Sequence, residues 1–219
     1  MFKEDWTVLR QVEVSFEEKK SLFICNIKRI KNEEEAMDFI NSIKEKYKDA
    51  THNVYAYITN NGISMRYSDD GEPQGTAGPP VLEVLKRENV NDVAVVVTRY
   101  FGGILLGAGG LVRAYSASCK QGVDAAGKVK RKMGIKFSMI VDYEKYGKIN
   151  YYLQSKNIKI LDVEYMENIR IQGVCLEEEF EKIHSDIIEI MGGNDIIKVT
   201  DNNLVFVDEA ERIMEVQES

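Results

Sequence analysis

The sequence predicts an α+β protein with two domains, over residues 1–130 and 131–219. The order of elements changes between them, from strands and helices around one apolar run to a β-α-β-β-α-β pattern. The charge changes as well. Residues 1–130 hold 18 Lys+Arg and 18 Asp+Glu, whereas residues 131–219 hold 11 and 18 and so carry the whole net charge of −7.

The first domain opens with a predicted strand over residues 21–30, which is rich in β-forming side chains. A helix follows, because Asn32 and Glu35 match a capping box and apolar residues recur at helical spacing up to Tyr47. We therefore expect this helix to lay one apolar face on a sheet.

A hairpin is predicted after this helix. Its strands are residues 53–59 and 63–67, and the turn between them is Asn60-Asn61-Gly62. Asn-Gly supplies the positive φ angles that tight hairpin turns require.

A second helix, an apolar strand and a third helix complete the first domain. Pro79 and Pro80 suit a first helical turn, where no N–H is needed, so a short helix is expected over 80–88. Residues 92–98 form an almost unbroken apolar run, as expected for a strand covered on both faces. Residues 111–123 predict the third helix, so this domain is a sheet with helices packed against it.

The second domain follows a basic, linker-like segment at residues 127–132. Asp142 supplies a start signal for its first helix, and Gly192-Gly193 stops its second. The β-α-β-β-α-β order is typical of a ferredoxin-like sandwich, in which two helices cover one face of a four-stranded antiparallel sheet. The charged tail after Asp208 is expected to fray or to extend as a helix. The expected strands are 133–141, 158–166, 169–176 and 196–207, and the expected helices are 142–155 and 177–191.

Composition places the chain among ordinary globular proteins, with 44% hydrophobic and 30% charged residues. No run approaches the roughly 18 apolar residues of a membrane helix, and the N-terminus lacks the apolar core of a signal peptide. We therefore expect a cytoplasmic protein. Cys25, Cys119 and Cys175 stand in no metal-ligand spacing, which predicts reduced, buried thiols rather than a disulfide or a zinc site.

The segment RYFGGILLGAGGLVRAY, residues 99–115, is unusually rich in glycine. It lies between an apolar strand and a helix, so free N–H groups near Gly109 would bind an anion together with Arg99 and Arg113. The glycine spacing matches neither G-x-x-x-x-G-K-[ST] nor G-x-G-x-x-G. The alternative is that the glycines only permit close helix-on-strand packing and a sharp crossover. The five glycines are Gly102, Gly103, Gly107, Gly109 and Gly110.

Aromatic and basic side chains in this segment favour nucleic acid. Tyr100 and Phe101 beside Arg99 offer a stacking surface and a cation. Aromatic residues next to a strand end also belong to cores, so this interpretation depends on a local basic cluster in the first domain. The candidates for that cluster are Arg66, Lys86, Arg87, Arg99 and Arg113.

The turn after the hairpin carries three carboxylates, on Asp69, Asp70 and Glu72, which suggest a metal or acid/base site. The alternative is a solvated turn, because Asp and Gly are common turn residues. His52 is either a base or a hydrogen-bonded structural residue. No Ser/His/Asp or Cys/His combination stands out, so a hydrolase triad is not predicted.

Two long motifs in the first domain resemble the IMPACT/YigZ family. The first is SDDGEP with GTAGPP, at residues 68–73 and 75–80. The second is VTRYFGG with the LG and GLVRAY that follow, within residues 97–115. Residues 21–24 and ATHN at 50–53 are also similar. The resemblance covers essentially the whole chain, in the two-domain arrangement of bacterial members.

The resemblance implies an N-terminal domain similar to the second domain of a small-subunit ribosomal protein, to elongation factor G domains and to galactokinase-type kinases. It also implies a ferredoxin-like C-terminal domain similar to the last domain of elongation factor G. Eukaryotic relatives act in translational control, with an additional N-terminal protein-binding domain that is not expected here. Some bacterial relatives carry a proline dipeptidase label, but the paired metal carboxylates and histidines of such a peptidase are not in this sequence.

We therefore expect a non-enzymatic protein linked to translation or its regulation, which binds RNA, the ribosome or a translation factor through residues 68–80 and 99–115. No cofactor, metal, membrane partner or DNA sequence specificity is expected. Arg99 and Arg113 would contact phosphate, Tyr100 would stack, and glycines would allow close approach. The expected ligand-binding residues are Arg99, Tyr100, Gly102, Gly103, Gly109, Gly110, Arg113, Asp69, Asp70, Glu72 and His52.

Two alternatives stay open. One is a nucleotide- or metal-binding enzyme that uses the same glycine-rich cleft, with the acidic turn holding the metal. The other is a protein-interaction module that acts through the acidic second domain.

Overall fold

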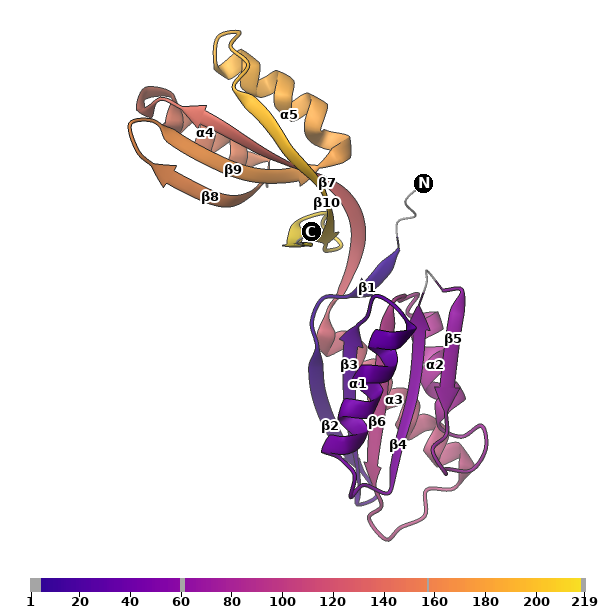
Figure 1. Cartoon of the computed structure of the whole chain (residues 1–219). Coiled ribbons are helices and arrows are strands. Elements are labelled where there is room, and N and C mark those ends of the chain that lie inside the picture. Colours follow the sequence, from indigo (N-terminus) through magenta and orange to yellow (C-terminus); the bar gives the residue numbers. More distant parts are fainter. Residues whose placement is uncertain (1–4, 60–61, 157, 218–219) are drawn as a thin grey trace. The chain divides into compact units, whose positions relative to one another are not determined.

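A computed structural model describes residues 5–59, 62–156 and 158–217 of the chain. The fold is mixed α+β and divides into two compact units, Met1–Val129 and Lys130–Ser219 (Figure 1). Each unit has its own hydrophobic clusters. Within the described ranges, no helix is long and apolar enough to cross a membrane.

The first unit is a three-layer structure. Its antiparallel sheet has the strand order β2-β3-β6-β4-β5, with α1 on one face and α2 and α3 on the other (Figure 1). The strands are β1 (Trp6–Val8), β2 (Val12–Glu18), β3 (Ser21–Arg29), β4 (His52–Thr59), β5 (Ser64–Ser68) and β6 (Val93–Tyr100), and the helices are α1 (Glu33–Lys46), α2 (Gly78–Arg87) and α3 (Ala108–Ala126).

The central strand β6 is covered on both faces, as its apolar run predicts. Val93, Val95 and Val97 pack in the cluster with α2 and α3, whereas Ala94 and Val96 pack in the cluster with α1. All five side chains are fully buried. The sheet therefore supports a core on each side, which positions the ends of β6 rigidly.

The start of α1 confirms part of the predicted capping box. Asn32 Oδ1 accepts a hydrogen bond from the Glu35 backbone N–H at 2.8 Å. The Glu35 carboxylate accepts from the backbone N–H of Lys31 rather than from that of Asn32. This cap joins residues only three positions apart, so a local sequence motif can predict it.

Boundaries near the predicted site differ from the sequence expectation. β6 continues to Tyr100 because Tyr100 pairs with Leu22 of β3 and Arg99 pairs with His52 of β4. Arg99 and Tyr100 therefore lie in a strand, not in a loop. The helix expected from residue 111 begins at Ala108, which puts Gly109 and Gly110 in its first turn. The predicted turn residues Asn60 and Asn61 lie outside the described residues.

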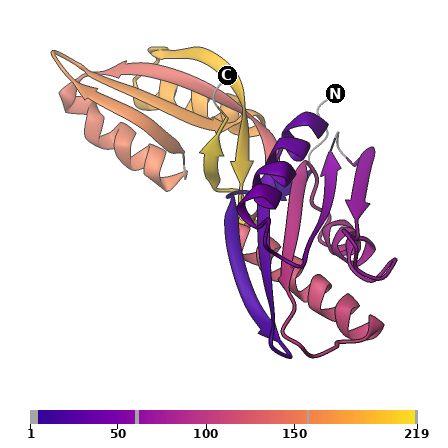
Figure 2. The ribbon, with the colours of Figure 1, turned by 60° about the horizontal axis from the view of Figure 1, so that its bottom comes forward.

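Three strands were not expected, namely β1, β2 and β11. The segment at 127–132, expected to be a linker, is mostly the start of β7. The tail, expected to fray or to form a helix, instead forms β11 against β10, as Figure 2 shows at the yellow end of the colour scale.

The second unit has the predicted β-α-β-β-α-β order. Its strands run β11-β10-β7-β9-β8, each antiparallel to its neighbour, and β10-β7-β9-β8 is the split βαβ arrangement. Both helices contribute to one cluster on one face of the sheet. The elements are β7 (Lys128–Val141), α4 (Tyr143–Ser155), β8 (Lys159–Tyr165), β9 (Ile169–Leu176), α5 (Glu177–Ile190), β10 (Ile197–Val207) and β11 (Ile213–Val216).

The three cysteines are free and buried, as the sequence predicts. Burial raises the pKa of Cys25 to about 12, so this thiol stays protonated at neutral pH. Cys25 Sγ lies against α3, where a Cβ at Gly122 would overlap it.

The close approach of α3 to β3 gives a test of core packing. We expect Gly122→Ala to lower the free energy of unfolding of the first unit by about 1–3 kcal/mol, because the added methyl overpacks the core. Fluorescence of Trp6, the single tryptophan, reports this unit's unfolding in urea. Gly109→Ala in the same helix is the matched control, since a Cβ there meets no atom within 4 Å. Equal stability of Gly122→Ala and the wild type would contradict the packing described.

Candidate binding pocket in the first unit

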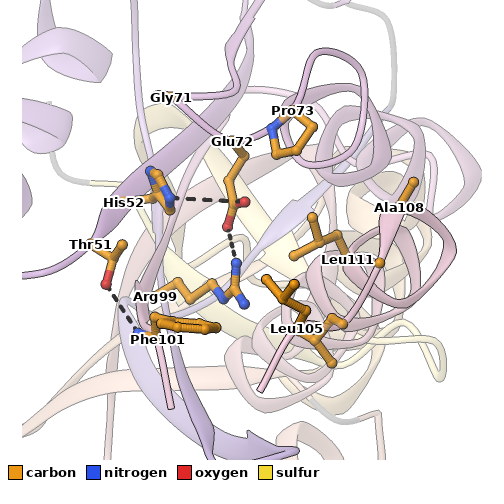
Figure 3. A pocket seen from close by; sticks show the side chains of 12 residues that line it. Thr51, His52, Gly71, Glu72, Pro73, Arg99, Phe101, Leu105, Ala108 and Leu111 are labelled. Carbon is orange, nitrogen blue, oxygen red and sulfur yellow. Dashed lines mark hydrogen bonds and ion pairs between the residues drawn. The ribbon is translucent and has the colours of Figure 1, made fainter. Parts of the chain in front are cut away.

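A pocket of about 360 Å³ lies among three segments that are far apart in sequence. These are the start of β4, the turn after β5, and the stretch from the end of β6 to the first turn of α3 (Figure 3). Both segments that the sequence singled out, 68–80 and 99–115, contribute to it. The polar lining residues are Thr51, His52, Glu72 and Arg99, and the apolar ones are Pro73, Phe101, Leu105, Leu106, Ala108 and Leu111.

An ion pair between Arg99 and Glu72 forms the polar end of the pocket. Arg99 Nη1 lies 2.6 Å from Glu72 Oε1, and the two side chains are only 6% and 3% exposed. Tyr115 donates its hydroxyl to the same oxygen at 2.8 Å, and Arg99 Nη2 donates to Ser21 Oγ at 3.3 Å. The guanidinium also lies 5.5 Å from the ring centroids of Phe23 and Phe101. The buried charge on Arg99 is therefore neutralised and held in place.

His52 presents a hydrogen-bond acceptor to the pocket. Its Nδ1 lies 2.8 Å from the backbone oxygen of Asp70, and because a carbonyl only accepts, Nδ1 carries a proton. In the neutral ring, Nε2 is then an acceptor, 3.9 Å from Glu72 Oε2 (Figure 3). No donor within the described part of the chain reaches Glu72 Oε2.

The acidic turn is held by hydrogen bonds within the protein. Asp69 accepts from the backbone N–H groups of Gly75, Ala77 and Gly78, the last at 2.8 Å, so it supplies acceptors at the start of α2. Asp70 accepts from the Asn53 N–H at 2.7 Å and from Lys44 at 2.8 Å. Among the described residues, no group of three or more His, Cys, Asp or Glu is placed to hold a metal.

The glycines beside the pocket serve mainly the geometry of the chain itself. A Cβ at Gly102 would overlap the backbone of Lys20, so only glycine allows this close approach. Gly107 has a φ of +72° immediately before α3. Gly103 also has a positive φ, and Gly109 and Gly110 lie within α3. At Gly102 the neighbouring group is part of the chain, in line with the packing alternative.

The rim of the pocket is apolar and exposed. Leu105 is 84% exposed, Phe101 45% and Ile104 42%. Leu106 and Leu111 below them are buried. A wall of this kind binds apolar groups, with the polar end fixing orientation.

Three of the eleven predicted site residues, His52, Glu72 and Arg99, line the pocket, and the other eight lie outside its lining, Tyr100 and Arg113 among them. The Tyr100 hydroxyl donates to Asp49 at 2.9 Å, and Arg113 lies exposed on α3. The sequence prediction missed Tyr115 and Thr51, whose hydroxyl accepts from the Phe101 N–H at 3.0 Å. The four-residue spacing from Leu111 places Tyr115 on the inner face of α3, but its bond to Glu72 is visible only in the fold.

The buried ion pair gives the first prediction for this site. Glu72→Gln leaves the Arg99 guanidinium without a counter-charge, so we expect the free energy of unfolding of the first unit to fall by about 3–5 kcal/mol. Urea unfolding followed by Trp6 fluorescence measures this loss. Glu83→Gln is the control, because its partner Lys86 is exposed and no measurable change is expected. A Glu72→Gln variant as stable as the control would contradict the assigned role.

Tyr115 gives a second prediction, on alkaline stability. Burial raises the pKa of Tyr115 far above its usual value, and the Glu72 carboxylate raises it further. Because the folded pKa exceeds the unfolded pKa of about 10, the stability is present below pH 10 and is lost as the pH rises. Above that pH, we expect the wild type to lose about 1.4 kcal/mol more per pH unit than Tyr115→Phe. Urea unfolding at several pH values between 8 and 11, roughly spanning the unfolded pKa, measures both slopes, and parallel slopes would refute the prediction.

Comparison with known families matches both units. The family described as the Impact N-terminal domain matches residues 19–123, and a domain of unknown function, DUF1949, matches residues 139–194. All the lining residues of the pocket lie within the first match.

Similar proteins and structures extend over most of the chain. IMPACT family member YvyE of Bacillus subtilis is 40% identical over 87% of this chain and 88% of its own length. IMPACT family member YigZ of Escherichia coli is 33% identical over 74% and 81% of the two chains. A crystal structure of a hypothetical protein aligns with a TM-score of 0.58 and 27% identity, covering 91% of this chain and 97% of the other. The two-domain translational regulator Yih1 aligns over 56% and 47% of the two chains at 23% identity, with a TM-score of 0.34, too low to establish a shared fold.

These matches confirm the family resemblance of the sequence motifs. The two family matches fall on the two compact units, one on each. The chain belongs to the IMPACT family.

Proposed function

We propose that this protein is a non-enzymatic binding protein linked to translation or its regulation. Its first unit binds a protein of the translation apparatus, a translation factor or a ribosomal protein, through the pocket and its apolar rim. The observation that supports this most is the exposure of Leu105, with Phe101 and Ile104 beside it, at an apolar concave surface. Clustered exposed apolar side chains are typical of protein interaction sites.

The charges around the pocket favour a protein over RNA. Arg99 is buried and paired with Glu72, so it offers no free cation to a phosphate. Two other members of the predicted basic cluster are also paired, Arg66 with Glu33 and Lys86 with Glu83. Binding of phosphate backbones depends on clustered, accessible cations. Arg113 is exposed, and its substitution therefore distinguishes the two kinds of partner.

The link to translation is supported by family membership. The family resemblance implies that eukaryotic relatives act in translational control. We also propose that the first unit is similar to the second domain of a small-subunit ribosomal protein. The second unit would be similar to the last domain of elongation factor G. The split βαβ order of the second unit is in line with that likeness. Translation takes place in the cytoplasm, where the protein is expected to act.

An enzyme that holds nucleotide or metal in the same cleft has less support. The carboxylates expected to hold a metal already accept hydrogen bonds from the protein. Asp69 accepts three backbone N–H groups, Asp70 accepts from Lys44 and Asn53, and Glu72 is paired with Arg99.

The test uses the immobilised full chain with two probes, salt-washed ribosomes and the protein fraction released by the salt wash. We expect the immobilised wild-type chain to retain a protein from the ribosomes or from the salt-wash fraction, even after ribonuclease treatment. Leu105→Asp should weaken retention about tenfold or more, because it places a charge at the apolar rim. Ile63→Asp is the matched control, since Ile63 is 80% exposed and does not line the pocket. Arg113→Ala should bind as the wild type does.

Two outcomes would refute the proposal. Retention that ribonuclease abolishes, and that Arg113→Ala weakens in a salt-dependent way, would indicate RNA as the partner. Equal retention by Leu105→Asp and Ile63→Asp would show that the rim is not the binding surface.

A further inference from the structure

We infer that the polar end of the pocket accepts a neutral primary carboxamide carried on an apolar stem. The group would bond to Glu72 and His52, while its stem lies against Phe101 and the leucines of the wall. This inference rests on the proposed function, because it specifies which side chain of the protein partner enters the pocket, an asparagine or a glutamine next to an apolar residue.

Two unused acceptors face one another in the pocket. Glu72 Oε1 accepts from Arg99 and Tyr115, but no donor among the described residues reaches Oε2. His52 Nδ1 donates to the Asp70 carbonyl, and in the neutral ring Nε2 is then an acceptor. The Glu72 side chain is 3% exposed and the His52 side chain 20%, so a ligand that supplies donors to these acceptors is favoured over one that supplies none.

The separation of the two acceptors fits one NH₂ group. Glu72 Oε2 and His52 Nε2 lie 3.9 Å apart. A nitrogen at about 2.9 Å from each spans that gap and donates one hydrogen to each acceptor. A group with a single hydrogen, such as a hydroxyl, would satisfy only one of them.

The charges around the acceptors favour a neutral head group. A cation would lie near the Arg99 guanidinium and near the first turn of α3, which carries partial positive charge. The Glu72 carboxylate would not offset this repulsion, because it already pairs with Arg99 at 2.6 Å. An anion would place its oxygens against two acceptors, and the charge of the nearby Arg99 is already balanced by Glu72. A carboxamide offers an NH₂ to the acceptors and a carbonyl oxygen to the positive end of α3.

The remaining volume and lining suit an apolar stem. About 360 Å³ is at the lower end of the range for small-ligand pockets. Phe101, Leu105, Leu106 and Leu111 supply most of the wall. A short apolar stem with an amide head therefore fits better than a large or strongly charged ligand.

The experiment titrates the full chain with three probes that share one branched stem, 4-methylpentanamide, 4-methylpentanoate and 4-methylpentylamine. Backbone amide NMR resonances of residues 71, 72 and 105–111 report binding. We expect the carboxamide to shift these resonances with a millimolar Kd and to bind about tenfold more tightly than either charged probe. His52→Phe should weaken carboxamide binding about fivefold or more, because it removes one acceptor. His184→Phe, at the other histidine of the chain, is the matched control and should leave the affinity unchanged.

Three results would overturn the inference: binding of either charged probe as tight as that of the carboxamide, unchanged carboxamide affinity in His52→Phe, or no shift with any probe. These results are separate from the test of the proposed function. If Leu105→Asp abolishes protein retention but the carboxamide does not bind, only the inference fails. If Leu105→Asp retains the partner in full, the proposed function fails whatever the titration shows.

Discussion

The pocket depends on the buried ion pair between Arg99 and Glu72. It connects the end of β6 to the turn after β5, to α3 through Tyr115 and to β3 through Ser21. Two charges removed from water are tolerated only when their remaining hydrogen-bonding groups are well satisfied. Glu72 Oε1 accepts from two donors and Arg99 donates to two acceptors, whereas the buried Arg99 Nε has no partner among the described residues. Most of the polar groups of the pair, but not all of them, are therefore satisfied within the protein.

The acidic turn contacts all three helices of the first unit through three closely spaced carboxylates. Asp69 accepts backbone N–H groups at the start of α2, Asp70 binds Lys44 of α1, and Glu72 binds Tyr115 of α3. Three carboxylates in four residues thus have three different structural partners. Their roles explain the charge density of this turn without a bound cation, and they fix Glu72 at the pocket.

The surface around this fixed polar end is suited to recognition of a protein. The rim is apolar and exposed, the buried charges of Arg99 and Glu72 cancel, and Arg66 and Lys86 of the predicted basic cluster are paired with glutamates. Such a site discriminates through shape and hydrogen-bond pairing rather than through long-range attraction. The second unit has its own core, and its buried Lys132 forms ion pairs with the exposed side chains of Glu178 and Glu211.

Local signals in the sequence determined the α+β class, the order of the elements from β3 to β10, the cap of α1 and the two-faced burial of β6. They also singled out residues 68–80 and 99–115, where glycine, proline and charge concentrate, and the structure places parts of both segments at one pocket. Only the tertiary structure decided that Arg99 is a buried partner of Glu72 and that Tyr115 donates a hydrogen bond to the same carboxylate. It also decided that Tyr100 and Arg113 lie outside the pocket lining. It also decided the edge strands β1, β2 and β11. The physical reason is that a helix cap or an apolar run acts over a few residues, whereas an ion pair between residues 72 and 99 and the pairing of an edge strand depend on contacts that form only when distant segments meet.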